Sequence, residues 1–103
     1  MVHKRLLGRT ADDISIYLVD GKKIRDIESV DFTMGGHGYV FRFIPRGEIW
    51  IDDRIAKSER GFTIRHELWE YDLMSDGVPY GEAHRRANIV EKKARLKALR
   101  ERG

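Results

Sequence analysis

The spacing of apolar residues changes at about Ser58, and this change constrains the fold more than any other feature of the chain. Before it, apolar residues form short runs, several of which alternate with polar residues as in a β-strand with one buried face. After it, apolar residues recur at the spacing of one side of an α-helix. A set of strands followed by a set of helices predicts an α+β domain.

About five short strands are predicted within residues 13–52, from the runs of apolar residues there. Residues 14–19 and 22–27 flank Asp20-Gly21, a pair that favours a two-residue hairpin loop because both loop positions need positive φ. Three more strands are expected at residues 30–33, 39–44 and 48–52, and residues 35–38 are expected to form a turn or wide loop. Hairpin-like succession predicts an antiparallel sheet.

Two helices, about 58–74 and 79–101, are predicted to form a C-terminal helical hairpin. Ser58 suits the N-cap of the first helix and Glu59 its positive first turn. Gly77 suits the position just past a helix, and Pro79 the first turn of the next. The side chains expected to pack the first helix are Phe62, Ile64, Leu68, Trp69 and Leu73. At this length we predict a single domain, 1–103.

Charge is distributed unevenly along the chain. Residues 85–103 carry eight Lys/Arg against two Glu, whereas residues 1–84 carry twelve Lys/Arg against fifteen Asp/Glu. The basic character therefore belongs to the second helix, which we interpret either as a solvated face or as a surface for nucleic acid or a protein partner. The acidic body favours the first interpretation, since it would oppose a nucleic acid.

Composition excludes some functional classes. The chain has no cysteine, so disulfides and thiolate metal sites are excluded. No apolar run approaches the roughly 20 residues of a membrane-spanning helix, and the first residues lack the apolar core of a signal peptide. We therefore expect a cytoplasmic protein without membrane contact. Gln is absent and Asn occurs once, a composition typical of thermophile proteins.

A candidate metal site lies in the first predicted helix. His66 and Glu70 are four residues apart and so project from one face, with Glu67 beside them. The predicted turn between the helices places His84 at about the level of Glu70 and within reach of an ion bound by His66. By the same count Glu91 lies too far along the second helix, so we rank it below His84.

The runs Gly47-Glu-Ile-Trp-Ile-Asp52 and Glu59-Arg-Gly-Phe-Thr-Ile-Arg-His66-Glu67-Leu-Trp-Glu70 resemble the small zincin metallopeptidases, in particular those that cleave phage-type repressors. The resemblance covers roughly residues 39–74, about a third of the chain. It implies that His66 is the first zinc ligand and that Glu67 is the general base that activates water. It also implies a zincin-like fold, in which the strand around residues 49–51 is the edge strand that receives a peptide substrate.

Glu70 departs from the family pattern, which has a second histidine at this position. A carboxylate still ligates Zn²⁺, the metal that we expect first, and suits Mn²⁺ or Fe²⁺ as well. One hypothesis is therefore a metal-binding protein with His66, Glu70 and His84 as ligands, either a metal-dependent peptidase or a degenerate relative that keeps the fold. The alternative is a non-enzymatic binding module that uses the basic second helix, with His66 and Glu70 as ordinary surface partners.

Three further features favour structural roles. His37 lies among three glycines and is expected in a flexible turn rather than at an ion or phosphate site. Asp52-Asp53 is expected to close a strand rather than to bind a cation. The aromatic residues Tyr39, Phe41 and Phe43 could stack on bases, but their period-two spacing favours one buried face of the sheet.

Overall fold

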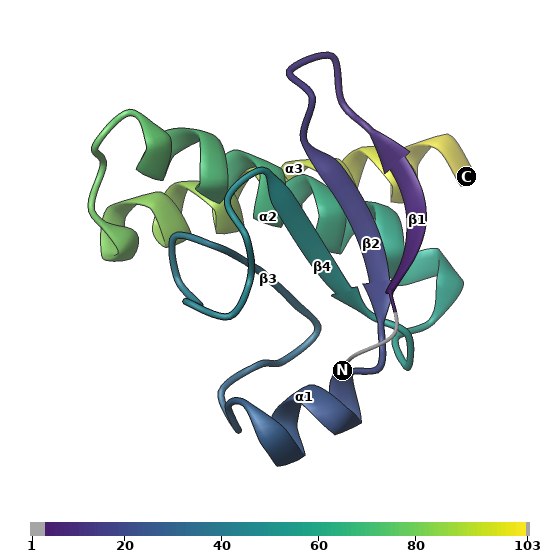
Figure 1. The fold of residues 1–103 in the computed structure, drawn as a ribbon. Helices are drawn as coiled ribbons and strands as arrows, with labels where there is room; N and C mark the ends of the chain where they lie inside the picture. Colours follow the sequence, from purple (N-terminus) through teal and green to yellow (C-terminus); the bar gives the residue numbers. More distant parts are fainter. Residues whose placement is uncertain (1–3, 103) are drawn as a thin grey trace.

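The computed structural model describes residues 4–102 and has an α+β fold, as predicted. A four-stranded sheet lies in front of two long helices in Figure 1, and a short third helix lies at one end of the sheet. The elements, in chain order, are β1 (Lys4–Arg9), β2 (Ser15–Val19), α1 (Gly21–Ile27), β3 (Gly35–His37), β4 (Glu48–Asp52), α2 (Lys57–Ser75) and α3 (Tyr80–Arg102).

The sheet is mixed, so the prediction of an antiparallel sheet of about five strands is wrong. Its strand order is β1-β2-β4-β3. β1 pairs with β2 and β3 with β4 in antiparallel fashion, whereas β2 and β4 run parallel. The parallel pair is possible because α1 and the long segment after it return the chain to the starting end of the sheet. β1 was not among the predicted strands, which began at about residue 13.

The Asp20-Gly21 pair starts a helix rather than a hairpin loop, so this prediction is also wrong. The Asp20 carboxylate accepts a hydrogen bond from the backbone N–H of Lys23 at 3.1 Å, as an N-cap residue does. Glycine is needed at position 21 because the backbone there lies against the side chain of Asp52, and not because φ is positive. A Cβ on Gly21 would collide with the carboxylate of Asp52. Asp52 in turn pairs with Arg25 of α1 at 2.8 Å, which fastens the helix to β4.

The segment expected to be a loop, Gly35–His37, is instead the buried edge strand β3. The strands predicted on either side of it, at residues 30–33 and 39–44, are absent from the described structure, where these residues form turns and an isolated bridge. The chain folds back tightly after β3: a Cβ at Gly36 would lie 2.7 Å from the ring of Phe41. Phe41 and Phe43 nevertheless pack against the core, but from a turn, so the predicted sheet face of Tyr39, Phe41 and Phe43 is wrong.

The helical hairpin is confirmed to within a residue or two. α2 runs from Lys57 to Ser75, Gly77 follows it with φ +91°, and α3 begins just after Pro79. Ser58 is not the N-cap: Ala56 occupies that position without a side-chain hydrogen bond. No helix in the described part of the chain is sufficiently long and apolar to cross a membrane.

Helix α2 lies between the sheet and α3, and this position determines what each of its faces contacts (Figure 1). Ile64 and Leu68 pack against a core cluster of Ile16, Ile49 and Ile51, as expected. Trp69 is 48% exposed, so the expectation that it packs in the core is wrong. The residues on the face of α2 between the sheet and α3 are polar, and they form the candidate site.

Candidate metal centre

Four residues on this inner face of α2 are buried although they are polar: Thr63, His66, Glu67 and Glu70. The positions recur at helical spacing, so their side chains project to the same side, between β3 and α3. His66 is 8% exposed, Glu67 9% and Glu70 3%. Burial of charged groups costs free energy unless they are paired or bind a metal, so these side chains need partners.

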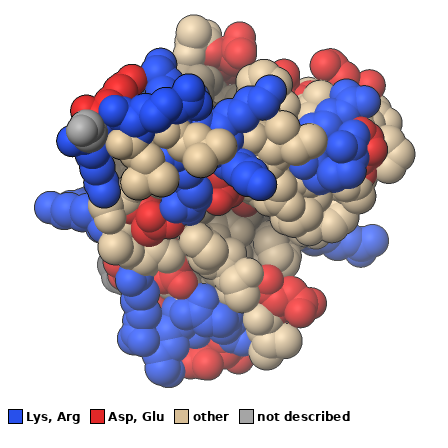
Figure 2. Space-filling model, turned by 180° about the vertical axis from the view of Figure 1, so that it is seen from behind, with Lys and Arg blue, Asp and Glu red and all other residues tan. Residues whose placement is uncertain are grey.

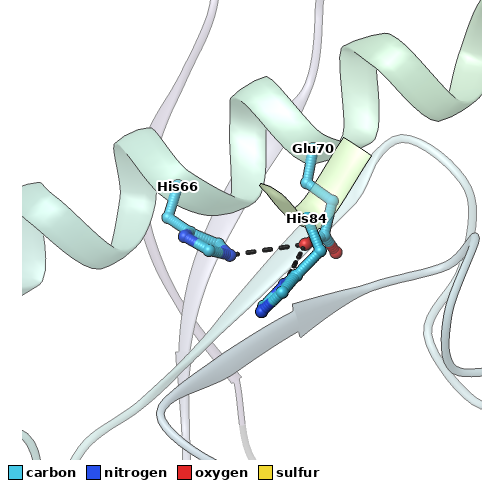
Figure 3. A group of neighbouring side chains, drawn as sticks. All are labelled: His66, Glu70 and His84. Atoms are coloured by element: carbon cyan, nitrogen blue, oxygen red, sulfur yellow. Dashed lines mark hydrogen bonds and ion pairs between the residues drawn. The ribbon is translucent and has the colours of Figure 1, made fainter. Parts of the chain in front are cut away.

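Glu70 is the centre of the cluster. The side chains of His66, Glu70 and His84 converge, as predicted (Figure 3). Nε2 of His66 lies 3.3 Å from Oε2 of Glu70, one turn along the same helix. Nδ1 of His84, which reaches across from α3, lies 2.8 Å from the same oxygen. The three ligand atoms all lie within 4.8 Å of one another, so this group could hold a metal ion.

His37 also belongs to the cluster, which the sequence reasoning missed. It is fully buried on β3, and its Nε2 lies 2.8 Å from Oε1 of Glu70. The prediction of a flexible turn was wrong because it treated the flanking glycines as a source of flexibility. A Cβ at Gly38 would lie 2.6 Å from a backbone carbonyl oxygen, so this glycine permits tight packing around the histidine.

Glu91 is not part of the converging ligand group, in agreement with its rank below His84, but it lies closer to the site than the register count implied. Its Oε1 lies 3.0 Å from Nδ1 of His66. Side chains on a helix lean toward the N-terminus, so Glu91 reaches back about one turn along α3 toward His66. Its other oxygen accepts from Arg95 at 3.0 Å, and Arg95 also donates two hydrogen bonds to Glu59 at the start of α2.

These contacts determine which nitrogen of His66 is available to an ion. A carboxylate can only accept, so Nδ1 of His66 donates to Glu91 and Nε2 donates to Glu70 when no ion is bound. Nε2 is then the nitrogen that would lose its proton to bind an ion, because Nδ1 stays engaged by Glu91. In the metal-free protein the hydrogen bond to Glu70 raises the pKa of His66, against the opposing effect of burial and with help from the charges of Glu67 and Glu91. A carboxylate behind a metal-binding imidazole is the usual arrangement in metalloproteins.

The two buried glutamates of α2, Glu67 and Glu70, have opposite electrostatic environments. Burial would raise the pKa of Glu70, but hydrogen bonds from His37, His66 and His84 outweigh it and hold this pKa well below its usual range. Burial, followed by the nearby charge of Glu70, raises the pKa of Glu67 to about 8. Among the residues that the structure describes, none donates a hydrogen bond to Glu67, whose nearest basic atom is Nε2 of His66 at 4.0 Å.

Two small cavities flank the cluster, and three residues line both of them: Thr33, Glu67 and His84. One cavity, of about 110 Å³, extends toward Tyr80 of α3. The other, of about 280 Å³, extends along α3 toward Asn88. A small group in either cavity would therefore lie against the carboxyl group of Glu67.

Two expectations about neighbouring residues are settled by the fold. β4, which was expected to be an edge strand, pairs with β2 on one side and β3 on the other and has no free edge. Asp52 closes β4, as expected, and its carboxylate is engaged by Arg25 and by the backbone N–H of Arg54 at 3.0 Å.

A scan of family models, a search of curated proteins and a search of solved structures each found no match to this chain. The resemblance to zincin peptidases therefore rests on residues 47–52 and 59–70 alone.

Proposed function

We propose that this protein binds one divalent transition-metal ion through His66, Glu70 and His84 and acts as a metal-dependent hydrolase. The observation that carries the proposal is the approach of two imidazole nitrogens to the same carboxylate oxygen inside the protein. Two nitrogens and one oxygen are a donor set that suits Zn²⁺ first and also accommodates Mn²⁺ or Fe²⁺.

The spacing of the donor atoms fits such an ion. Two atoms that each lie 2.0–2.2 Å from a tetrahedral ion are about 3.3–3.6 Å apart. The contact of Glu70 with His66, 3.3 Å, matches this spacing, and that with His84 is 2.8 Å, so the side chain of His84, which is 43% exposed, would move outward. Three protein ligands leave the fourth position open, which is the arrangement of catalytic rather than structural zinc sites.

Glu67 is the group that we propose to move the proton. A bound ion would supply Lewis acidity, which polarises a carbonyl and makes water easier to deprotonate. Glu67 faces both cavities and lacks a hydrogen-bond donor among the described residues, so its carboxylate is free to accept a proton from water. Without an ion, burial and then the charge of Glu70 raise the pKa of Glu67 to about 8, and the positive charge of a bound ion would lower this pKa and favour the ionised carboxylate that a base needs.

The lining of the cavities indicates the class of substrate. Neither cavity is lined by Lys or Arg among the described residues, whereas Asp31, Glu67, Glu70 and Glu91 contribute carboxylates. Phosphate esters are disfavoured by this charge, and a neutral or cationic peptide is favoured. Because β4 has no free edge, the peptide would have to bind along the cavities or at β3, the edge strand nearest to the site.

Metal content and two substitutions test the proposal. Protein purified without chelator should contain close to one transition-metal ion per chain. His66→Ala should lose the metal and the activity, whereas Glu67→Gln should keep the metal and lose the activity, since a base needs no contact with the ion. Ile16→Val, which changes a buried residue of β2 outside the candidate site, is the control and should keep the metal.

Activity is best measured against a broad peptide library with Zn²⁺ supplied. Wild type should cleave and Glu67→Gln should not. If wild type binds the ion but cleaves nothing, while Glu70→His gains cleavage, the protein is a zincin-like scaffold without the chemistry. If it binds no Zn²⁺, Mn²⁺ or Fe²⁺ at all, the metal proposal is wrong.

The alternative, a module that binds nucleic acid or a protein through α3, has less support. Arg85 and Arg86 pair with Glu82, and Arg95 pairs with Glu59 and Glu91. Figure 2, which views the molecule from behind, shows that the Lys and Arg side chains on that face are interspersed with acidic and uncharged ones. Binding to DNA or RNA at low salt that weakens steeply as salt rises would favour the alternative.

A further inference from the structure

Both ring nitrogens of His37 are engaged in the protein interior. Nε2 lies 2.8 Å from Oε1 of Glu70, and Nδ1 accepts a hydrogen bond from the backbone N–H of Tyr39 at 3.2 Å. The ring of Tyr71 packs edge-on against the imidazole, with the ring centroids 5.5 Å apart. This ring is therefore held in one orientation by the fold of the residues around it.

The backbone amide determines the tautomer of His37. An amide N–H can only donate, so Nδ1 must present its lone pair, and the ring proton must lie on Nε2. Nε2 therefore donates its hydrogen bond to Oε1 of Glu70. Because Nδ1 is occupied by the amide of Tyr39, the proton on Nε2 cannot move to the other ring nitrogen, so His37 supports Glu70 and does not bind metal itself.

This tautomer decides between two arrangements of the site. The ligand atoms of His37, Glu67 and Glu70 also lie within 4.8 Å of one another, so a second ion bridged to the first by Glu70 is geometrically conceivable. Binding there would remove the proton from Nε2 while Nδ1 still faces an amide that can only donate. The ring would then be an imidazolate, which is far less accessible near neutral pH than the neutral imidazole of an ordinary ligand.

We propose that His37 is a positioning residue: it holds Oε1 of Glu70 so that Oε2 faces His66 and His84 and ligates a single ion. The inference rests on the proposed metal site. Without the hydrogen bond from His37, the carboxylate of Glu70 could rotate about its last bond. Losing such an outer hydrogen bond typically lowers metal affinity about 10–100-fold.

Three variants test this role by direct measurement of Zn²⁺ affinity and stoichiometry against a competing chelator. His37→Leu removes the donor and should weaken binding about 10–100-fold. His37→Gln places a side-chain N–H near the position of Nε2 and should restore most of the affinity. Ile16→Val, a control at a buried position of β2 outside the candidate site, should bind as wild type does, and all four proteins should bind one ion at saturation.

Circular dichroism and thermal melting in chelator report whether each variant is folded.

The wild type provides a further measurement that needs no variant. In protein with ¹⁵N-labelled histidine, the proton on Nε2 of His37 should be visible by NMR before and after Zn²⁺ is added. Loss of that proton on metal binding, or two ions in wild type and one in His37→Leu, would overturn the proposal in favour of a dinuclear centre. Equal affinity in wild type and His37→Leu would leave His37 as a packing residue. Absence of metal binding in wild type would refute the site itself.

Discussion

Glu67→Gln is expected to change how the stability of the metal-free protein depends on pH. Glu67 is 9% exposed and lies beside the charge of Glu70, and its carboxylate accepts no hydrogen bond from the described residues. Burial, and then repulsion by Glu70, raises its pKa to about 8 from a reference of 4.5. Ionisation of Glu67 therefore destabilises the folded chain, and glutamine removes the ionisable group while keeping the size of the side chain.

The sign and size of the effect follow from linkage between proton binding and folding. Below pH 4.5 both the folded and the unfolded chain hold this proton, so Glu67 makes no contribution. Between pH 4.5 and 8 only the folded chain retains it, so the free energy of unfolding falls with pH, by up to about 1.4 kcal/mol per pH unit. Glu67→Gln should therefore gain about 3–4 kcal/mol relative to wild type between pH 5 and pH 8.

Urea denaturation at several pH values in the presence of chelator measures this difference. The histidine residues are common to both proteins, so most of their own titration cancels when the two curves are subtracted. Glu101→Gln is the control, because this glutamate of α3 is 68% exposed and should change the pH dependence little. Parallel curves for wild type and Glu67→Gln would show that Glu67 is ionised in the fold at neutral pH, and the reasoning about its environment would be wrong.

Other predictions concern the metal and the packing. Zn²⁺ at a hundred times its Kd should raise the free energy of unfolding of wild type by about 2.7 kcal/mol and leave His66→Ala unchanged. Glu91→Gln should weaken Zn²⁺ binding about 10–100-fold in a chelator competition, because it removes the carboxylate behind His66. Phe32→Ala should cost about 3–5 kcal/mol in urea denaturation, since this ring is fully buried. Gly61→Ala should stabilise α2 by about 0.5–1 kcal/mol, because a Cβ there meets nothing within 4 Å. Gly38→Ala should destabilise the protein by about 1–3 kcal/mol, because its Cβ would lie 2.6 Å from a backbone oxygen.

Local signals in the sequence were sufficient for the helical hairpin and for β4. The helical spacing after Ser58, with Gly77 and Pro79 marking the turn, predicted both helices to within a residue or two. The register of that hairpin also brought Glu70 and His84 together, because a short turn between antiparallel helices leaves little freedom in which residues face one another. The core of the candidate site was therefore predictable from nearby residues alone.

The same kind of local signal was misleading where one sequence pattern is compatible with two local structures. Asp20-Gly21 suits a hairpin loop, but aspartate is equally a helix N-cap, and the contact of Arg25 with Asp52 holds a helix there. The glycines around His37 suit a turn, but the return of Phe41 over the strand needs them as close-packing positions. In the first case the deciding contact comes from a distant part of the chain, and in the second it comes from the way the next few residues fold back.

What the sequence by itself determined was the set of residues that could bind a metal from α2 and the turn into α3. Only the tertiary structure decided that β2 and β4 pair in parallel, that His37 faces Glu70, and that Glu91 faces His66. His37 and Glu70 are separated by 33 positions in the sequence, and His66 and Glu91 by 25. Helical periodicity and a short turn fix positions only a few residues apart, whereas the packing of the sheet against α2 and of α2 against α3 fixes the rest.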